Sequence, residues 1–485
     1  RVYSDKSTAH IVGYVSQVSA KDLQTKEYLR DMSVTGIAVG KTGLEKKVDK
    51  EIIGKVGFQR YEVNAYGKRI RQIKFDQGKS GKSYKTTIDL EIQKYTSKII
   101  EDLSAAVCVM DIYSGDIIVM ASAPTFDPNS FVHGINKKDW DYLLKHRDKP
   151  LINKAISALY PPGSTIKTIV ALSALENDTV NPSKKIRCKG MMELYGQKFH
   201  CWKKKGHGFM NMRDAIKQSC DIYFYETAKK LGVDRLSITA KKFGLGQRVL
   251  DGYMEEKSGV VPNTRWKKEV IGKNWYLGET LLTGIGQGYF STTPLQLCLM
   301  TAQIANGGYE IKPRIVFDKN DMKGKKLKEY IESQNTSNAE TDISKTNQII
   351  GNFKFKTLFR NPENIKFIQD AMYGATNEPG GTSYSSRLTK KEFIYAGKTG
   401  TSQTKRITEL QREADVKQKD LAYGDRDHAQ FVAFAPYNKP HYAISVLVEH
   451  GGSGSAAAAP LAKQVIKKIL EKHQERMRKQ NEYTI

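Results

Sequence analysis

The chain contains no apolar run long enough to cross a membrane as a helix, although it spans 485 residues. It is also short of acidic residues, with 52 Asp and Glu against 78 Lys and Arg, which gives a formal charge of +26. A basic balance can indicate nucleic-acid binding, but zinc-finger, helix-turn-helix and RNA-stacking patterns are missing. The lysines are scattered rather than clustered, which indicates a solvated surface with loose attraction to anionic polymers or lipids. We therefore expect no nucleic-acid partner.

Residues 161–167 read PPGSTIK and place the hydroxyl of Ser164 three positions ahead of the amine of Lys167. The preceding Pro-Gly is a turn signal, so we expect Ser164 at the N-terminus of a helix, with both side chains on one face. The segment is otherwise apolar, and a buried ammonium is costly there unless it is paired or its pKa falls. This arrangement describes an activated nucleophile. Taken alone, the motif also fits an N-capping serine followed by a snorkelling lysine.

Two further motifs follow in order along the chain. Ser219-Cys220-Asp221 opens the helix-like run DIYFYETAKKLG, and residues 394–401 run from a strand-like stretch into Lys398-Thr399-Gly400-Thr401. The order Ser-x-x-Lys, Ser-x-Asn/Asp, Lys-Thr-Gly resembles the signature of penicillin-binding proteins and serine β-lactamases.

The resemblance extends beyond these motifs to nearly the whole chain. Segments that carry it are HIVGYV (10–15), VNAYGKRIRQIK (63–74), TFDPNSFV (125–132), WKKKGHG (202–208) and GIGQGYFSTTPLQL (284–297). They are similar to the elongation-type class B penicillin-binding proteins. This resemblance implies a peptidoglycan D,D-transpeptidase that cross-links stem peptides during cell-wall elongation and is inhibited by β-lactams.

The resemblance also implies a role for each motif residue. Ser164 would attack the D-Ala-D-Ala carbonyl to give an acyl-enzyme, and Lys167 would act as the base. Ser219 would relay a proton to the leaving amine. Asp221 stands where many relatives have asparagine, which leaves open how protons are shared among Lys167, Lys398 and Asp221.

The third motif is expected to bind the substrate's terminal carboxylate. Lys398 supplies positive potential, while Thr399 and Thr401, on either side of Gly400, offer hydroxyls. By analogy with the family, the backbone N–H groups of Ser164 and Thr401 would form the oxyanion hole. No cofactor is expected for catalysis.

The five cysteines form no C-x-x-C pair. Cys108 and Cys298 lie in apolar segments and are expected to be buried, inert thiols. Cys188, Cys201 and Cys220 occur in one region that also contains His207. Three thiolates and an imidazole suit tetrahedral zinc.

A structural zinc site would tether the loop that carries Ser219 and Asp221, because Cys220 lies between them. Two alternatives remain open, a Cys188–Cys201 disulfide and plain buried cysteines. His200 is the rival imidazole, but His207 lies in a glycine-flanked turn and is the preferred ligand.

Strand-like segments near both ends of the chain enclose a helical middle. This pattern predicts an α/β (α+β) chain with an antiparallel sheet covered by helices, as in the penicillin-binding transpeptidase fold, with a helical subdomain. We expect a smaller β-rich pedestal module over residues 1–80 and the transpeptidase domain over 81–485, with mobile loops at 318–350 and 402–427. AAVCVMD and DIIVMAS are expected to form one hairpin, and QFVAFAP and YAISVLVEH another.

The family resemblance implies partners and a location. Peptidoglycan stem peptides, β-lactams, a membrane glycosyltransferase and a periplasmic scaffold of the elongation machinery are the expected partners. The family carries one N-terminal transmembrane helix, which would precede Arg1, so we expect the chain to be a piece of a single-pass inner-membrane protein with its catalytic domain in the periplasm. The alternatives are a D,D-carboxypeptidase and a non-catalytic penicillin sensor or scaffold, because motifs alone do not separate them.

Overall fold

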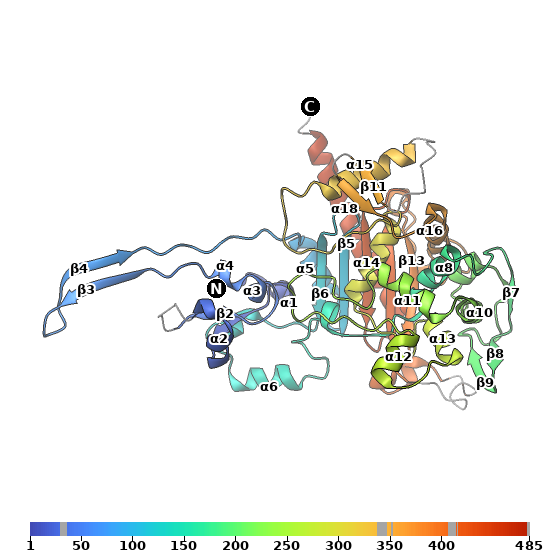
Figure 1. The fold of residues 1–485 in the computed structure, drawn as a ribbon, viewed down its shortest axis with the longest axis horizontal. Coiled ribbons are helices and arrows are strands. Elements are labelled where there is room, and N and C mark those ends of the chain that lie inside the picture. The colour runs from blue at the N-terminus through green and yellow to red at the C-terminus, as the bar shows by residue number, and fades with distance from the viewer. Residues whose placement is uncertain (30–35, 337–346, 351–352, 406–413, 415, 483–485) are drawn as a thin grey trace. The chain divides into compact units, whose positions relative to one another are not determined.

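A computed structural model describes residues 1–29, 36–336, 347–350, 353–405, 414 and 416–482 (Figure 1). The chain divides into two compact units. The first contains residues 1–86, 125–152 and 252–255, and the second contains residues 87–124, 153–251 and 256–485. The boundary expected at residue 80 stays a prediction.

The first unit consists of short helices and two-stranded sheets. Strands β1 (Val15–Gln17) and β2 (Ala38–Gly40) pair antiparallel, as do β3 (Phe58–Val63) and β4 (Arg69–Asp76). Its helices are α1 (Ala9–Val12), α2 (Ala20–Thr25), α3 (Gly43–Lys47), α4 (Asp49–Ile52) and α6 (Lys137–Lys145). Phe126 and Phe131 form its small apolar core with Ala9, so the segment 125–152 completes this unit.

The second unit is built on one five-stranded antiparallel sheet of order β13-β14-β15-β5-β6. The strands are β5 (Ala105–Asp111), β6 (Ile117–Ala123), β13 (Ala396–Ser402), β14 (His428–Ala435) and β15 (Tyr442–Val448). Both predicted hairpins are confirmed, because β5 pairs with β6 and β14 pairs with β15. The sheet thus brings β13, which lies near the end of the sequence, into one layer with strands from its beginning.

Helices cover both faces of this sheet (Figure 1). Side chains alternate between the faces of a strand, and the one that carries Val107 and Val109 packs on α5 (Leu90–Ile99) and α18 (Ala459–Glu482). The opposite face carries Cys108 and contacts α14 (Pro294–Ala305), whose twelve residues are all buried. An apolar helix without a polar face is therefore explained by burial on all sides.

The remaining elements of the second unit form the helical subdomain and its edges. The helices are α7 (Lys154–Ser157), α8 (Lys167–Glu176), α9 (Met212–Lys217), α10 (Asp221–Leu231), α11 (Val233–Lys242), α12 (Thr264–Ile271), α13 (Leu277–Gly284), α15 (Lys323–Thr336) and α16 (Pro362–Asn377). Short strand pairs are β7 (Ile186–Cys188) with β10 (Gly208–Met210), β8 (Met191–Leu194) with β9 (Gln197–His200), and β11 (Asn347–Ile350) with β12 (Phe353–Lys356).

One of the two segments predicted to be mobile loops, residues 318–350, contains a helix, and parts of both segments are not described. Residues 318–350 contain the helix α15, because Leu327 is buried and Lys326 pairs with Glu329 along the helix. Residues 337–346 lie outside the described residues, as do 406–413 and 415 of the other predicted loop. Among the described residues, no helix combines the length and apolar character needed to span a bilayer.

Candidate active site

The turn that carries Ser164 is pressed against strand β13. Ser164 lies in a 3₁₀ turn (Gly163–Ile166) that leads into α8, so it stands at the start of the predicted helix. Gly163 has a φ of 54°, and a Cβ at this position would lie 2.6 Å from the carbonyl oxygen of Thr401. The positive φ and the close carbonyl both require glycine here. Because Gly163 has no side chain, the Ser164 turn can lie directly beside the third motif.

Lys167 is fully buried and contacts the second motif directly. Its Nζ lies 2.6 Å from Oδ1 of Asp221, and it donates to the carbonyl oxygen of Ser219 at 2.9 Å and to Ser219 Oγ at 3.3 Å. The shortest contact of this amine is thus a carboxylate, so the buried ammonium is paired.

Lys398 approaches the same serine hydroxyl from strand β13. Its Nζ donates to Ser219 Oγ at 2.9 Å and to the carbonyl oxygen of Thr399 at 3.0 Å, and its side chain is fully buried. Ser219 Oγ therefore lies between two lysine amines. All three motifs, which are far apart in the sequence, meet at this hydroxyl.

Burial dominates the electrostatics of this group. It lowers the pKa of Lys398 well below the usual lysine value, and the nearby charge of Lys167 lowers it further. Burial also raises the pKa of Asp221, against the opposing effect of Lys167. Both shifts favour neutral forms, so the site can move protons among its groups without large changes in charge.

Ser164, Ser219 and Asp221 line one cleft with a volume of about 1660 Å³. The third motif forms one wall of this cleft through Thr399, Gly400 and Thr401. Further lining groups come from the hairpin β8–β9 and the residues after it, from α10 and from residues 276–282 at α13, and include Tyr195, Phe199, Trp202, Tyr225, Tyr276 and Leu282. The cleft thus combines the polar groups of the motifs with several aromatic side chains.

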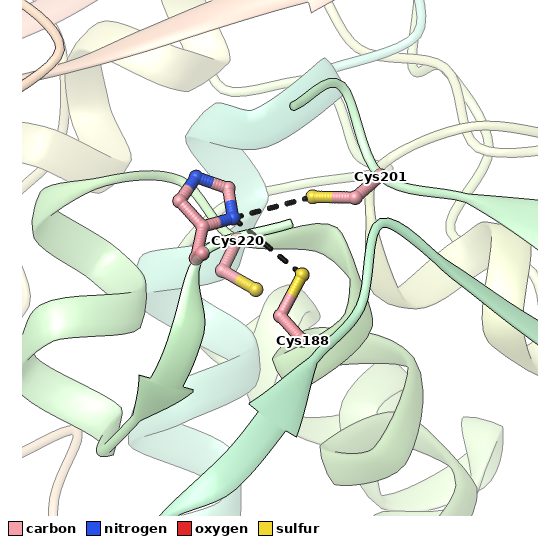
Figure 2. A group of neighbouring side chains, drawn as sticks. Cys188, Cys201 and Cys220 are labelled. Carbon is pink, nitrogen blue, oxygen red and sulfur yellow. Dashed lines mark hydrogen bonds between the residues drawn. The ribbon is translucent and has the colours of Figure 1, made fainter. Parts of the chain in front are cut away.

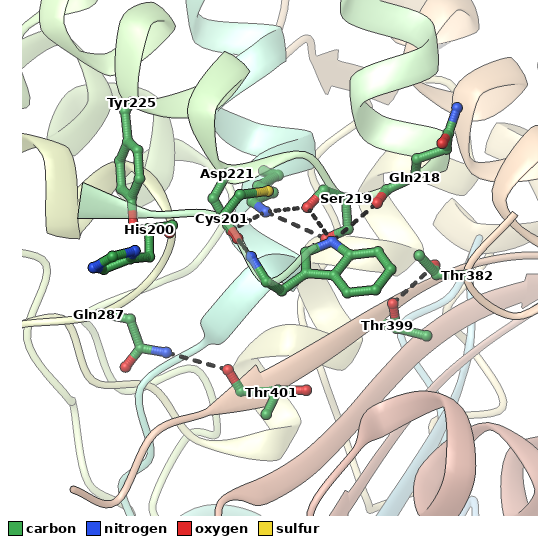
Figure 3. Close-up of polar contacts among 12 residues, drawn as sticks. His200, Cys201, Gln218, Ser219, Asp221, Tyr225, Gln287, Thr382, Thr399 and Thr401 are labelled. Carbon is green, nitrogen blue, oxygen red and sulfur yellow. Dashed lines mark hydrogen bonds and ion pairs between the residues drawn. The ribbon is translucent and has the colours of Figure 1, made fainter. Parts of the chain in front are cut away.

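Three neighbours of the motifs were missed by sequence reasoning. Thr399 Oγ1 donates to Thr382 Oγ1 at 2.9 Å, and Gln287 Nε2 donates to the Thr401 carbonyl at 3.1 Å (Figure 3). The backbone N–H of Trp202 donates to Oδ2 of Asp221 at 2.8 Å. Trp202 and Gln287 occur in the WKKKGHG and GIGQGYF segments, so the whole-chain likeness contained a signal for both.

The predicted metal ligands come together beside this site. The ligand atoms of Cys188, Cys201, His207 and Cys220 all lie within 4.8 Å of one another, and the three sulfurs converge on one point (Figure 2). The cysteine side chains are buried, and all five cysteines of the chain are free thiols, so the alternative Cys188–Cys201 disulfide is not formed.

The distances in this cluster fit a tetrahedral metal. His207 Nδ1 lies 3.6 Å from Cys188 Sγ and 3.5 Å from Cys201 Sγ. Zinc–sulfur bonds of about 2.3 Å and zinc–nitrogen bonds of about 2.05 Å give an N···S edge of about 3.6 Å at the tetrahedral angle. These four residues therefore could hold a metal ion, while His200 is not part of the group.

Comparison with known proteins agrees with this geometry. Residues 105–470 match the family described as the penicillin-binding protein transpeptidase domain, and residues 1–86 match the penicillin-binding protein dimerisation domain. The fold and the site thus define a penicillin-binding transpeptidase, and the chain belongs to this family.

Its relatives place it more narrowly. The chain is 33% identical to the peptidoglycan D,D-transpeptidase MrdA of Salmonella typhimurium. The 467 aligned residues cover 96% of this chain and 71% of that protein. It is 32% identical to the Escherichia coli K12 protein of the same name, over 95% and 69% of the two chains. The protein is a peptidoglycan D,D-transpeptidase of the PBP2/MrdA type.

Solved structures show the same likeness. A complex of PBP2 with MreC from Helicobacter pylori matches with a TM-score of 0.79 and 32% identity, over 96% of this chain and 78% of that chain. PBP2 of Pseudomonas aeruginosa in complex with WCK 5153 matches with a TM-score of 0.76 and 32% identity, over 95% and 88%.

Proposed function

We propose that Ser164 is the nucleophile of this transpeptidase and that Lys167, Ser219, Asp221 and Lys398 move its proton. The observation that carries the proposal is the position of Ser219 Oγ, 3.3 Å from Lys167 Nζ and 2.9 Å from Lys398 Nζ, at the cleft that Ser164 also lines. A hydroxyl between two amines can accept a proton from one side and donate one to the other.

Acylation begins with a proton transfer within the buried pair. A proton moves from the Lys167 ammonium to the Asp221 carboxylate, whose pKa is raised by burial, and leaves a neutral amine. This amine takes the proton of Ser164 Oγ while the oxygen attacks the D-Ala carbonyl carbon. When the peptide C–N bond breaks, Ser219 Oγ passes a proton to the leaving D-alanine nitrogen and is reprotonated from the lysines.

Substrate binding is assigned to the wall formed by β13. Thr399 and Thr401 would donate their hydroxyls to the terminal carboxylate, and Gly400 keeps the backbone close, since a Cβ there would lie 2.8 Å from Thr165 Cγ2. The backbone N–H groups of Ser164 and Thr401 would hold the oxyanion, and each such donor contributes roughly 3 kcal/mol.

A structural zinc ion at Cys188, Cys201, His207 and Cys220 is the second part of the proposal. The fit of the N···S distances to a tetrahedral site supports it, as does the ligand set of three thiols and one imidazole. The ion would supply no chemistry to the reaction. It would fix the backbone on both sides of Cys220 and, through Cys201, the segment that ends the β8–β9 hairpin.

We also propose the cellular setting that the relatives suggest. PBP2 of Helicobacter pylori forms a complex with MreC. A further structural neighbour, 26% identical with a TM-score of 0.72 over 94% of this chain and 74% of that chain, belongs to a peptidoglycan synthase complex that coordinates polymerization and crosslinking. By analogy this protein would act in wall elongation in the periplasm, anchored to the inner membrane, with a scaffold of the MreC type and a glycosyltransferase as partners.

Labelling with a fluorescent penicillin tests the site assignment. The wild-type protein should form a covalent adduct that mass spectrometry maps to Ser164, and S164A should form none. An adduct at another residue would refute the assignment. Supplying a stem peptide as acceptor separates a transpeptidase, which forms the cross-linked product, from a carboxypeptidase, which releases D-alanine to water only.

A further inference from the structure

Trp202 makes two hydrogen bonds to the second motif and a third to Gln218, the residue that precedes it. Its backbone N–H donates to Asp221 Oδ2 at 2.8 Å. Its indole Nε1–H donates to the carbonyl oxygens of Ser219 at 3.0 Å and Gln218 at 3.2 Å. Figure 3 draws Gln218, Ser219 and Asp221, which carry these acceptors. The same residue thus contacts the carboxylate that pairs with Lys167 and the backbone that carries the relay hydroxyl.

The Ser219 backbone needs such support because its conformation is unfavourable. Its φ of 56° lies in the left-handed region, which costs a non-glycine residue about 1–2 kcal/mol. The conformation directs the Ser219 carbonyl toward two donors, the indole N–H of Trp202 at 3.0 Å and Nζ of Lys167 at 2.9 Å. Removing the indole donor would leave the lysine as the carbonyl's partner and would free the peptide to rotate.

The indole ring also contacts His207. Trp202 follows Cys201 directly, and its ring packs edge-on against His207 with centroids 5.3 Å apart. Even so, the residue is 58% exposed and lines the cleft. One edge of the ring therefore points to the Ser219 carbonyl, while a large part of its surface faces the space that substrate enters.

We propose that Trp202 is a positioning residue for acylation. Its indole N–H holds the Ser219 carbonyl and so keeps Ser219 Oγ between the amines of Lys167 and Lys398, while its exposed ring forms a wall against the bound substrate. This inference rests on the proposed roles of Ser164 and Ser219. It adds a function to a residue that the three motifs do not include.

The isosteric change Trp202→β-(3-benzothienyl)alanine tests the indole donor, because it keeps the ring and replaces the N–H by sulfur. W202F serves as a second variant and W202A removes the ring as well. W275F is the matched control, since the Trp275 indole donates to Thr280 Oγ1 at 2.8 Å and Trp275 is not among the residues that line the described cleft.

Stopped-flow acylation by a fluorescent penicillin separates the acylation rate constant from the dissociation constant of the initial complex. We expect the benzothienyl variant and W202F to lower the rate constant roughly tenfold, the size of one lost hydrogen bond, with the dissociation constant within about twofold. W202A should also weaken initial binding, and W275F should match wild type in both constants.

Metal content and thermal unfolding, measured on the same samples, exclude a merely structural role. If the benzothienyl variant acylates at the wild-type rate, or slows only together with loss of bound metal or of thermal stability, the positioning role is wrong. If wild type forms no adduct, or S164A still forms one, the proposed site fails. If instead wild type is labelled at Ser164 and the Trp202 variant acylates equally fast, the site stands and only the role of Trp202 fails.

Discussion

The Nζ of Lys167 lies 2.6 Å from Oδ1 of Asp221, and the lysine side chain is completely buried. A buried charge pair of this kind adds little net stability when intact, but losing one partner is costly because the other charge remains in a low-dielectric environment. The pair also connects the first two motifs.

D221N should therefore destabilise the protein and slow acylation. The amide keeps the shape of the side chain but no longer balances the Lys167 ammonium or accepts its proton, so we expect a loss of about 3 kcal/mol in unfolding free energy and at least roughly a tenfold lower acylation rate at neutral pH. Denaturant unfolding and penicillin labelling measure the two effects. E363Q, which breaks the exposed pair with Lys366, is the control and should change stability by less than about 1 kcal/mol.

Removal of the proposed zinc ion should loosen the second motif. Purified wild-type protein should contain stoichiometric zinc, and H207N should contain almost none and unfold at a lower temperature, because His207 Nδ1 faces two of the thiols. H200N is the matched control, since His200 directly precedes the proposed ligand Cys201 in the chain but is not part of the cluster. Equal zinc in both variants would contradict the assigned ligand set.

Asp427 and His428 should give opposite pH dependences of stability. Burial raises the pKa of Asp427 to about 6, above the value of about 3.9 in an unfolded chain. Between these values the native state binds more protons, so this residue's contribution to the unfolding free energy falls as pH rises from about 4 to 6. Burial lowers the pKa of His428 to about 4, below the unfolded value of about 6.5, so its contribution rises over nearly the same range.

The two effects oppose each other in the wild type and separate in single variants. Relative to wild type, D427N should gain stability as pH rises from about 4 to 6, and H428N should lose it, each by about 1–2 kcal/mol after allowing for partial solvent exposure. Urea unfolding at several pH values measures both slopes. Identical slopes in the two variants would show that neither group keeps its shifted pKa.

G163A should be far more harmful than a glycine replacement at an equally strained but open position. The new Cβ would lie 2.6 Å from the Thr401 carbonyl oxygen, in a residue whose φ is 54°. We expect acylation to fall below detection and the unfolding free energy to fall by several kcal/mol, about 3 or more. Gly272 lies in the left-handed region, with a φ of 74° and a ψ of 15°, and a Cβ added there would meet nothing within 4 Å, so G272A should cost only about 1–2 kcal/mol and should keep labelling.

Local chemistry made much of this site predictable. The one-turn spacing of Ser164 and Lys167 and the preceding Pro-Gly dictate a shared helical face, and the structure has α8 beginning at Lys167. The apolar runs AAVCVMD and QFVAFAP, each followed by a turn, likewise predict strands of hairpins, and these became β5 and β14. Such features depend on residues that are close in the sequence.

The parts that sequence reasoning missed depend on distant residues. Trp202 approaches Ser219 only after the chain between them has folded around the Cys and His cluster, and no periodicity records that contact. Helix α15 was missed because its composition is polar, and its contacts with the rest of the domain, such as the burial of Leu327 and the packing of Tyr330 on Tyr309, come from residues distant in the sequence. The sequence left open how Lys167, Lys398 and Asp221 share protons. The direct contact between Lys167 and Asp221 became visible only in the folded chain.

Strand β13 stands at one end of the five-stranded sheet, so only one of its edges pairs with another described strand of that sheet. Thr399, Gly400 and Thr401 on this strand line the cleft. The edge of a sheet can accept a further extended backbone through main-chain hydrogen bonds. Inhibitors with a short peptide arm laid along β13 would be held by groups that belong to every amino acid, so side-chain substitutions on the strand would leave that part of their affinity intact.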